Sequence, residues 1–194
     1  MNAHILLVEG TCGMGKSTLL RGLLTKYVLG AEKPRTLLHL TQAHTYFPLV
    51  SGDPVSKRQH REHLRRILRM LDWDAQGLLY GLLDTLHLTH SFRPGTLSWS
   101  EMGYVDQNLA RLGGQMVFIR ARPETLWERI IILGHYPQKS GRSAEEVHEY
   151  YVREQAEMEK LARRSSLPTL FLEAEDSRED LLSKAYVFWM KEKG

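Results

Sequence analysis

The chain has little of what a secreted or membrane-embedded protein needs. Cys12 is the only cysteine in 194 residues, which excludes an intramolecular disulfide and favours a cytoplasmic setting. No apolar run approaches the roughly 20 residues that a membrane span requires. Residues 1–4 lack the basic and apolar stretches of a secretory signal, so we expect neither export nor membrane insertion.

Repeats, low-complexity tracts and linkers are also missing. No stretch rich in proline, glycine or serine divides the chain, and no segment is repeated. A chain of 194 residues can bury a core without metals or disulfides, so we expect one domain spanning residues 1–194. The net charge of +3 suits an anionic small ligand and argues against nucleic acid as a partner.

What the chain does have is an alternation of short apolar segments with longer segments of helical periodicity. The segments typical of strands are residues 5–8, 36–40, 86–92, 115–120 and 169–172. This order predicts an α/β fold with a five-stranded parallel sheet and helices on both faces. Ligands of such sheets bind beyond the carboxyl ends of the strands.

Several helix ends are marked by capping residues. Gly113 is placed to end a helix that starts near residue 98 or 100, and Pro123 is placed to begin the next one. Ser143 and Glu146 form a capping-box pattern that opens a long charged helix to about Arg164. The apolar face that we expect on the helix after Pro123 consists of Leu126, Ile130 and Leu133.

The most specific signal is the segment G-T-C-G-M-G-K-S at residues 10–17, which matches the Walker A pattern G-x-x-x-x-G-K-[ST]. Its glycines let successive backbone N–H groups converge on a phosphate, and a helix N-terminus adds positive potential. Lys16 would reach the β- and γ-phosphates of ATP, and Ser17 would supply an oxygen to Mg²⁺. The residues predicted to bind nucleotide are Gly10, Thr11, Cys12, Gly13, Met14, Gly15, Lys16, Ser17 and Thr18.

Two segments resemble the thymidylate kinase and deoxynucleoside kinase group. V-E-G-T-x-G-x-G-K-S-T at residues 8–18 is similar to the N-terminal motif of that group. V-F-I-R-A-R-P-E-T-L-W-E-R-I at residues 117–130 is similar to its fourth strand, followed by a Pro-Glu turn and a helix that carries an arginine, here Arg129. A lid-like polar stretch at residues 134–142 and the elements after it follow in the same order. The resemblance implies a P-loop NTPase fold with a lid, Mg·ATP as donor, and a nucleoside, nucleoside monophosphate or similar small molecule as acceptor.

The chain departs from that group after its second and third predicted strands. The group usually carries a carboxylate beyond strand 2 and an acid–arginine pair beyond strand 3. Here T-Q-A-H follows residue 40, and no acid occurs before Asp53. His90 and Arg93 follow the third predicted strand without an acidic partner. His90 is therefore a candidate base, and Arg93 is a candidate to bind an acceptor phosphate or the transferred charge.

Together these residues predict an ATP-dependent phosphotransferase. Lys16, Mg²⁺ on Ser17, and Arg129 or Arg142 would stabilise the γ-phosphoryl group while the lid excludes water. Two alternatives stay open: a phosphotransferase for another small molecule such as an antibiotic or a sugar, and a nucleotide-binding regulator or weak ATPase without transfer. We find no apolar strand that ends on the aspartate of motor ATPases. The apolar segment 78–83, interpreted as a helix face, leaves both core packing and a homodimer open.

Overall fold

A single parallel sheet organises the protein. The computed structural model describes residues 4–30, 37–40, 62, 69, 80–84, 99–134 and 143–191. Five parallel strands are hydrogen-bonded in the order β2-β3-β1-β4-β5. Their bounds are β1 His4–Gly10, β2 Leu37–Leu40, β3 Tyr80–Asp84, β4 Gln115–Arg120 and β5 Thr169–Glu173. The parallel α/β sheet predicted from the alternation of elements is therefore present.

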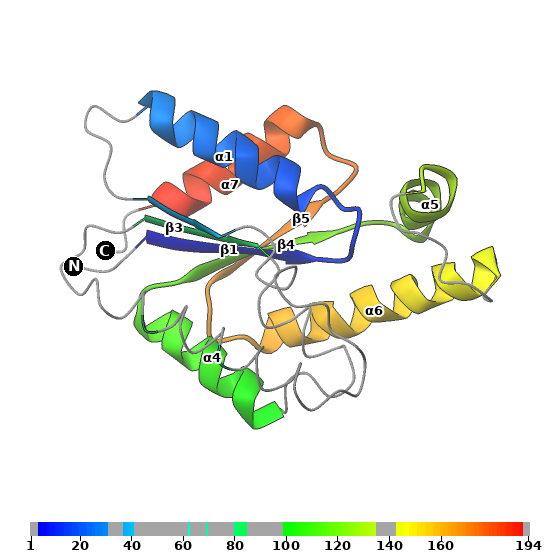
Figure 1. Cartoon of the computed structure of the whole chain (residues 1–194), viewed down its shortest axis with the longest axis horizontal. Helices are drawn as coiled ribbons and strands as arrows, with labels where there is room; N and C mark the ends of the chain where they lie inside the picture. The colour runs from blue at the N-terminus through cyan, green and yellow to red at the C-terminus, as the bar shows by residue number, and fades with distance from the viewer. Residues whose placement is uncertain are drawn as a thin grey trace.

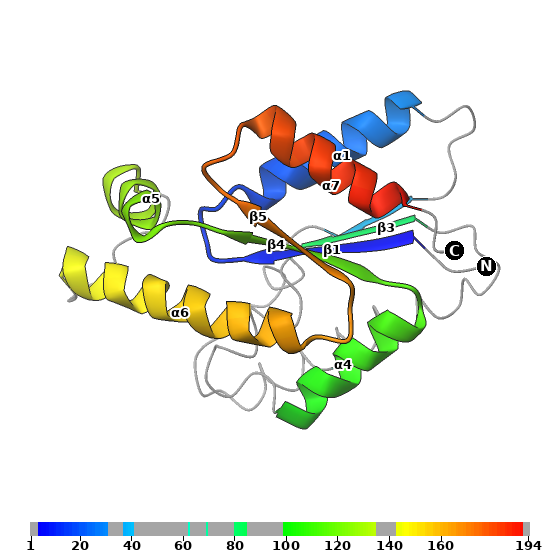
Figure 2. The same ribbon diagram turned by 180° about the vertical axis from the view of Figure 1, so that it is seen from behind.

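Helices cover both faces of this sheet. Figures 1 and 2 show α1 and α7 together on one face and α4 and α6 on the other. The helices are α1 Lys16–Gly30, α4 Trp99–Arg111, α5 Pro123–Trp127, the π-helix η1 Glu128–Ile132, α6 Ala144–Arg164 and α7 Arg178–Met190. Among the described helices, none is long and apolar enough to cross a membrane.

Side chains of the central strands alternate between two buried layers. In β1, Ile5 and Leu7 pack with the residues of α4 and α6, whereas Leu6 and Val8 pack with those of α1 and α7. All four side chains are at most 1% exposed. A strand buried on both faces is apolar at every position, which explains why the sequence shows short apolar runs here rather than an alternating pattern.

The third strand lies earlier in the chain than predicted. β3 is Tyr80–Asp84, whereas the sequence pattern placed a strand at residues 86–92 and a helix face at residues 78–83. Residues 80–83 belong to this strand, so their interpretation as part of a helix face is wrong. The predicted strand at residues 86–92 falls within residues 85–98, which lie outside the described residues. Gly81 packs its backbone against Ile5 of β1, where a Cβ would lie 3.4 Å from the Ile5 side chain. Periodicity alone cannot separate a short buried strand from a buried helix.

Most predicted helix ends are confirmed. The side chain of Ser143 accepts a hydrogen bond from the Glu146 N–H, and Glu146 accepts one from the Ser143 N–H, which completes the capping box of α6. Gly113 has φ 82° just after α4, and Pro123 begins α5. These signals are reliable because each one satisfies backbone groups that the helix itself leaves unpaired.

The helix after Pro123 does not continue as an α-helix. It changes at Glu128 into the π-helix η1, in which the N–H of Leu133 bonds to the carbonyl of Glu128 at 2.9 Å. A π-turn holds more residues than an α-turn, so it rotates later positions away from the face set by earlier ones. Leu126 and Ile130 are buried as predicted, but Leu133 is 58% exposed. The prediction that Leu133 belongs to the apolar face is therefore wrong.

Candidate active site

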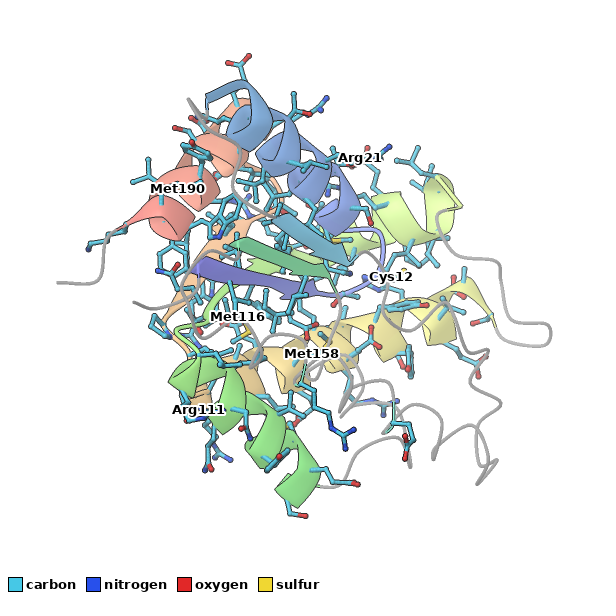
Figure 3. The ribbon with its side chains drawn as sticks, turned by 60° about the vertical axis from the view of Figure 1, so that its left-hand side comes forward. Cys12, Arg21, Arg111, Met116, Met158 and Met190 are labelled. Carbon is cyan, nitrogen blue, oxygen red and sulfur yellow. The ribbon has the colours of Figure 1, made fainter. Side chains whose placement is uncertain are left out.

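The glycine loop joins the carboxyl end of β1 to the first turn of α1. Gly10, Gly13 and Gly15 have φ values of 139°, 80° and 86°, which side chains rarely tolerate. At Gly10, a Cβ would lie 2.4 Å from the carbonyl oxygen of Ile119 on β4. Figure 3 shows Cys12 on this loop, at the end of the sheet where β1 leads into α1. The glycines are therefore required by the shape of the loop and by its close approach to β4.

Lys16 lies over the loop that it follows. Its Nζ donates hydrogen bonds to the carbonyl oxygens of Gly10 at 2.8 Å and Thr11 at 2.9 Å. The first turn of α1 begins at the same place, with the N–H groups of Thr18 and Leu19 bonded to the carbonyl of Gly15. A positive charge and a helix N-terminus are thus brought together at one end of the sheet, the combination that binds phosphate.

Two loop side chains anchor the loop rather than face solvent. Met14 is 1% exposed and belongs to the core layer under α1, so only its backbone is available to a ligand. Thr11 is also 1% exposed, and its Oγ1 has no hydrogen-bond partner among the described residues. Cys12 is half-buried between them. The buried side chains therefore hold the loop against the core, and the backbone of the loop remains available to a ligand.

The strand beside β1 ends on an acid that the sequence interpretation did not assign. Asp84 is the last residue of β3 and lies opposite Val8, two residues before Gly10. The absence of an acid after the third strand and of an apolar strand ending on aspartate were both expected, and both expectations are wrong. The signal is the apolar run L-L-Y-G-L-L-D at residues 78–84, whose pattern fits a helix face as well as a buried strand.

Hard oxygen donors suitable for Mg²⁺ occur at this end of the sheet. Ser17 lies in the first turn of α1, and Asp84 ends β3. Among the described residues, no group of three or more His, Cys, Asp or Glu could hold a metal ion. Mg²⁺ bound with a nucleotide usually needs only one or two protein oxygens, because phosphate and water supply the rest. A hydroxyl residue such as Ser17 and an acid such as Asp84 are the residue types that a nucleotide-bound Mg²⁺ uses.

The predicted cationic residues are only partly within the described part. Arg129 lies on η1, where its Nη2 donates a hydrogen bond to the carbonyl of Ala174 at 2.7 Å, just after β5. Its assignment to the transferred phosphoryl group stays a prediction. Arg142, His90 and Arg93 lie outside the described residues, so their assignments also stay predictions. Because β3 ends at Asp84, His90 and Arg93 do not directly follow the third strand.

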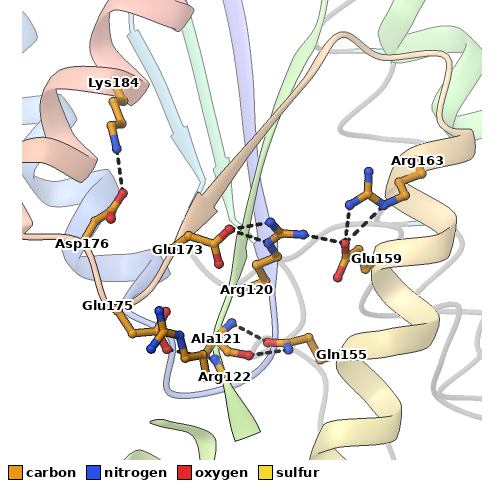
Figure 4. Close-up of polar contacts among 10 residues, drawn as sticks. All are labelled: Arg120, Ala121, Arg122, Gln155, Glu159, Arg163, Glu173, Glu175, Asp176 and Lys184. Carbon is orange, nitrogen blue, oxygen red and sulfur yellow. Dashed lines mark hydrogen bonds and ion pairs between the residues drawn. The ribbon is translucent and has the colours of Figure 1, made fainter.

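The turn between β4 and α5 is fixed from two sides. The amide of Gln155 on α6 accepts a hydrogen bond from the N–H of Ala121 and donates one to its carbonyl, both at 2.8 Å. The carboxylate of Glu175 accepts from the N–H of Arg122 at 2.8 Å (Figure 4). Burial raises the pKa of Glu175, but hydrogen bonds from the Thr125 side chain and the Arg122 backbone outweigh it and lower the pKa.

An ion-pair network continues from this turn to the outer strand. Arg120 contacts Glu173 on β5, with its Nε 2.7 Å from Oε1, and Glu159 on α6, with its Nη1 2.9 Å from Oε1 (Figure 4). Glu159 also accepts two hydrogen bonds from Arg163. The hydrogen bond to Glu173 is the main reason why the pKa of Arg120 is raised. The network fixes α6 against β4 and β5.

On its other side, α6 borders a hollow that the sequence did not predict. We call it the α6 concavity. It has a volume of about 490 Å³, and the described residues that line it are Glu146, Glu149, Tyr150 and Arg153. No motif marks these residues in the sequence, because charged positions on a long helix usually form a solvated face.

The fold is similar to that of several solved structures, two of which are named as kinases. The YorR protein of Bacillus subtilis, solved in complex with phosphorylated GDP, matches with a TM-score of 0.63 and 13% identity over 95% of this chain and 94% of that one. A shikimate kinase from Bacteroides thetaiotaomicron matches with a TM-score of 0.57 and 15% identity over 92% and 94%. A gluconokinase from Sinorhizobium meliloti 1021 matches with a TM-score of 0.55 and 14% identity over 95% and 90%.

These likenesses show the fold, because the identities are low. No family model and no curated protein sequence matches the chain. The α/β fold with a parallel sheet and helices on both faces, which the sequence predicts, is therefore confirmed. The finer resemblance to the thymidylate kinase and deoxynucleoside kinase group, including its lid, stays a prediction.

Proposed function

We propose that the protein is an ATP-dependent phosphotransferase that moves the γ-phosphate of ATP to a small acceptor. The observation that carries this proposal is the glycine loop at the end of β1, with its left-handed glycines and with Lys16 folded over it. The similarity to structures named as shikimate kinase and gluconokinase supports it, because such kinases act on small hydroxyl compounds. The nucleoside-type acceptor implied by the sequence resemblance belongs to the same proposal.

Donor binding would use groups that already converge on the loop. Backbone N–H groups of the loop and the N-terminus of α1 would bind the phosphates of ATP. Lys16 would exchange its bonds to the carbonyls of Gly10 and Thr11 for bonds to the β- and γ-phosphate oxygens. Ser17 and Asp84 would hold Mg²⁺, which supplies charge neutralisation on the phosphates when bound.

Transfer would proceed by displacement at the γ-phosphorus. The oxygen of the acceptor forms a bond to phosphorus, the bond from phosphorus to the β–γ bridging oxygen breaks, and ADP leaves. The proton of the acceptor hydroxyl passes to a base, for which Asp84 and the predicted His90 are the candidates. Positioning and charge neutralisation dominate this chemistry, so Lys16 and the arginines Arg93, Arg129 and Arg142 are expected to matter more than the base.

The test is an acceptor panel. The protein is incubated with Mg·ATP and, in separate reactions, nucleosides, nucleoside monophosphates and other hydroxyl compounds, and ADP release is followed. Release that depends on one acceptor class, with a phosphorylated product, supports the proposal. ATP binding without any acceptor-dependent ADP release contradicts it and favours a nucleotide-binding regulator or weak ATPase.

Cys12 allows nucleotide binding to be measured without knowing the acceptor. It is the only cysteine and lies half-buried on the loop, so a nucleotide there should shield its thiol. At a Mg·ATP concentration near 100 times Kd, the rate of alkylation by N-ethylmaleimide should fall about 100-fold. Mass spectrometry of the intact chain measures this rate.

A second cysteine provides the control for that measurement. In the double variant Cys12→Ser, Ser183→Cys, the only thiol lies at an exposed position of α7. Its alkylation rate should be the same with and without Mg·ATP. Equal protection of both thiols, or no protection of Cys12 at saturating nucleotide, would argue against nucleotide binding at the loop.

Asp84→Asn is expected to lower acceptor-dependent turnover about 100-fold and to raise the Mg²⁺ concentration needed for half-maximal activity. The reason is the position of Asp84, which ends β3 beside the last residues of β1. An amide there keeps the size of the side chain but loses the charge that a metal requires. A magnesium titration of turnover measures the effect, and Glu179→Gln on the exposed start of α7 is the control. An unchanged magnesium dependence would remove Asp84 from the site.

A further inference from the structure

The side chain of Thr11 is a buried polar group in the glycine loop that the proposed chemistry does not use. It is 1% exposed, and its Oγ1 is shielded from solvent without a hydrogen-bond partner among the described residues. Across that part of the chain it is the only buried side-chain oxygen or nitrogen in this condition. Such a hydroxyl has lost its hydrogen bonds to water and gained none, so it destabilises the conformation that contains it.

The carbonyl groups beside this hydroxyl are already paired. Lys16 donates from its Nζ to the carbonyl oxygen of Gly10 at 2.8 Å and to that of Thr11 at 2.9 Å. One of these carbonyls directly precedes the nitrogen of Thr11, and the other belongs to Thr11 itself. Two donors, an ammonium and a hydroxyl, therefore compete for one pair of nearby acceptors. The ammonium holds both, because a charged donor forms the stronger hydrogen bond.

ATP binding at the loop would change this balance. Phosphate oxygens are charged acceptors, which Lys16 prefers to neutral carbonyls. When the lysine moves to them, the carbonyls of Gly10 and Thr11 lose its hydrogen bonds. Gly10 is confined by β4, where a Cβ would lie 2.4 Å from the carbonyl oxygen of Ile119, so its carbonyl stays beside Thr11. The Thr11 hydroxyl is then the adjacent donor that lacks an acceptor.

We infer that Thr11 is a positioning residue of the nucleotide site and that its hydroxyl replaces Lys16 as a donor to the loop. In the free protein, Lys16 holds the two carbonyls and the hydroxyl is unpaired. With Mg·ATP bound, Lys16 pairs with the phosphates, and the Thr11 hydroxyl donates to a carbonyl that the lysine has released. This inference rests on the proposed binding of ATP at the loop and adds a side chain that favours the bound state.

The exchange has a characteristic energetic signature. The free protein carries the cost of an unpaired hydroxyl, and nucleotide binding removes that cost. A group that is better satisfied in the bound state than in the free state raises affinity by the difference. The Thr11 hydroxyl should therefore lower the stability of the free protein and raise its affinity for nucleotide.

Thr11→Val tests both halves of this signature, because valine has the shape of threonine without the hydroxyl. We expect the urea midpoint of the nucleotide-free protein to rise by about 0.5 M, since no buried hydroxyl is left unpaired. The Kd of Mg·ATP should rise about tenfold, because a released carbonyl then finds no donor. Urea unfolding measures the first effect, and a Mg·ATP titration of Cys12 alkylation by N-ethylmaleimide measures the second.

Two further variants separate the hydroxyl from the rest of the side chain. Thr11→Ser keeps the hydroxyl and removes a buried methyl group, so it should lower the urea midpoint and retain the Kd of the unsubstituted protein. Thr169→Val on β5 removes a hydroxyl that already has a partner, the carbonyl oxygen of Leu167 at 2.9 Å. It should lower the urea midpoint and leave the Kd unchanged.

The exchange with Lys16 is tested by repeating Thr11→Val in the Lys16→Ala background. Without the lysine, the hydroxyl has no competitor and pairs with a loop carbonyl in the free protein. Thr11→Val should then lower the urea midpoint instead of raising it. A rise of the same size in both backgrounds would show that the two side chains act independently, which would overturn the inference.

The remaining outcomes separate this inference from the proposed function. A lower urea midpoint for Thr11→Val, or its failure to fold, would mean that the hydroxyl is paired in the free protein and would overturn the inference. An equal rise of Kd in Thr11→Val and Thr11→Ser would overturn it as well. The expected shifts without acceptor-dependent ADP release refute the kinase function and support the inference. No protection of Cys12 in the unsubstituted protein refutes both.

Discussion

Replacing Lys16 by alanine is expected to lower acceptor-dependent ATP turnover about 100- to 1,000-fold, the usual cost of one group that stabilises developing charge. In the structure the ammonium group is held 2.8 Å from the carbonyl oxygen of Gly10 and 2.9 Å from that of Thr11. These bonds keep the ammonium group against the loop, where we propose that the phosphates bind. Alanine removes the charge without adding bulk, so the effect on turnover should be far larger than the effect on folding.

Lys26→Ala is the matched control for this substitution. Lys26 lies on the same helix, exposed, with its ammonium 4.7 Å from the centre of the Tyr186 ring. Its removal should leave turnover unchanged. Steady-state kinetics and urea unfolding of both variants separate catalysis from stability. Turnover of Lys16→Ala within a few-fold of the unsubstituted protein would refute the role assigned to the loop.

Gly10→Ala is expected to lower the free energy of unfolding by about 3 kcal/mol, the sum of a strained backbone and an overpacked contact. Gly10 has φ 139°, and a Cβ would lie 2.4 Å from the carbonyl oxygen of Ile119. Since Gly10 lies opposite Ile119 in the pairing of β1 with β4, relief requires the central strands to shift. The same shift would displace the first residue of the loop, so nucleotide protection of Cys12 should also be lost.

Gly103→Ala shows what the same substitution does without a clash. Gly103 is in α4, where a Cβ would meet no atom within 4 Å, and alanine should stabilise the helix by about 1 kcal/mol. Urea denaturation of both variants measures the difference. Equal unfolding free energies for the two variants would mean that the contact between Gly10 and Ile119 does not constrain the loop.

The parts of the fold that could be predicted from the sequence are those with local causes. The glycine loop, the capping box at Ser143 and the glycine stop after α4 each satisfy backbone groups within a few residues of themselves. The sequence also predicts strand β4 with its observed bounds, because residues 116–119 form an apolar run and turn residues lie on both sides of Gln115–Arg120.

The misplacement of β3 has a physical reason. Residues 78–84 are almost entirely apolar, and neither helix nor strand periodicity distinguishes them. Their state is decided by the strands on either side, since β3 is hydrogen-bonded to both β1 and β2. This placement also decides which residue ends the strand: a strand at residues 86–92 includes His90, whereas the observed strand ends at Asp84.

Contacts made by the other candidate residues join distant parts of the chain. Arg129 bonds to the carbonyl of Ala174, 45 residues away, and Gln155 bonds to Ala121, 34 residues away. The sequence motif identified Arg129 as a residue of interest but could not show its partner. The sequence contains no signal for Gln155, because a glutamine on a charged helix is typical of a solvated face.

The pair of hydrogen bonds from Gln155 to Ala121 has a thermodynamic consequence for binding. A side-chain amide that bonds to both the N–H and the C=O of one residue imitates a neighbouring strand, and Glu175 fixes Arg122 next to it. The chain therefore loses the conformational entropy of this turn when it folds, and a ligand that contacts the turn does not have to order it again. Because Gly10 lies opposite Ile119, two residues before Ala121, this rigidity extends to the edge of the phosphate-binding loop.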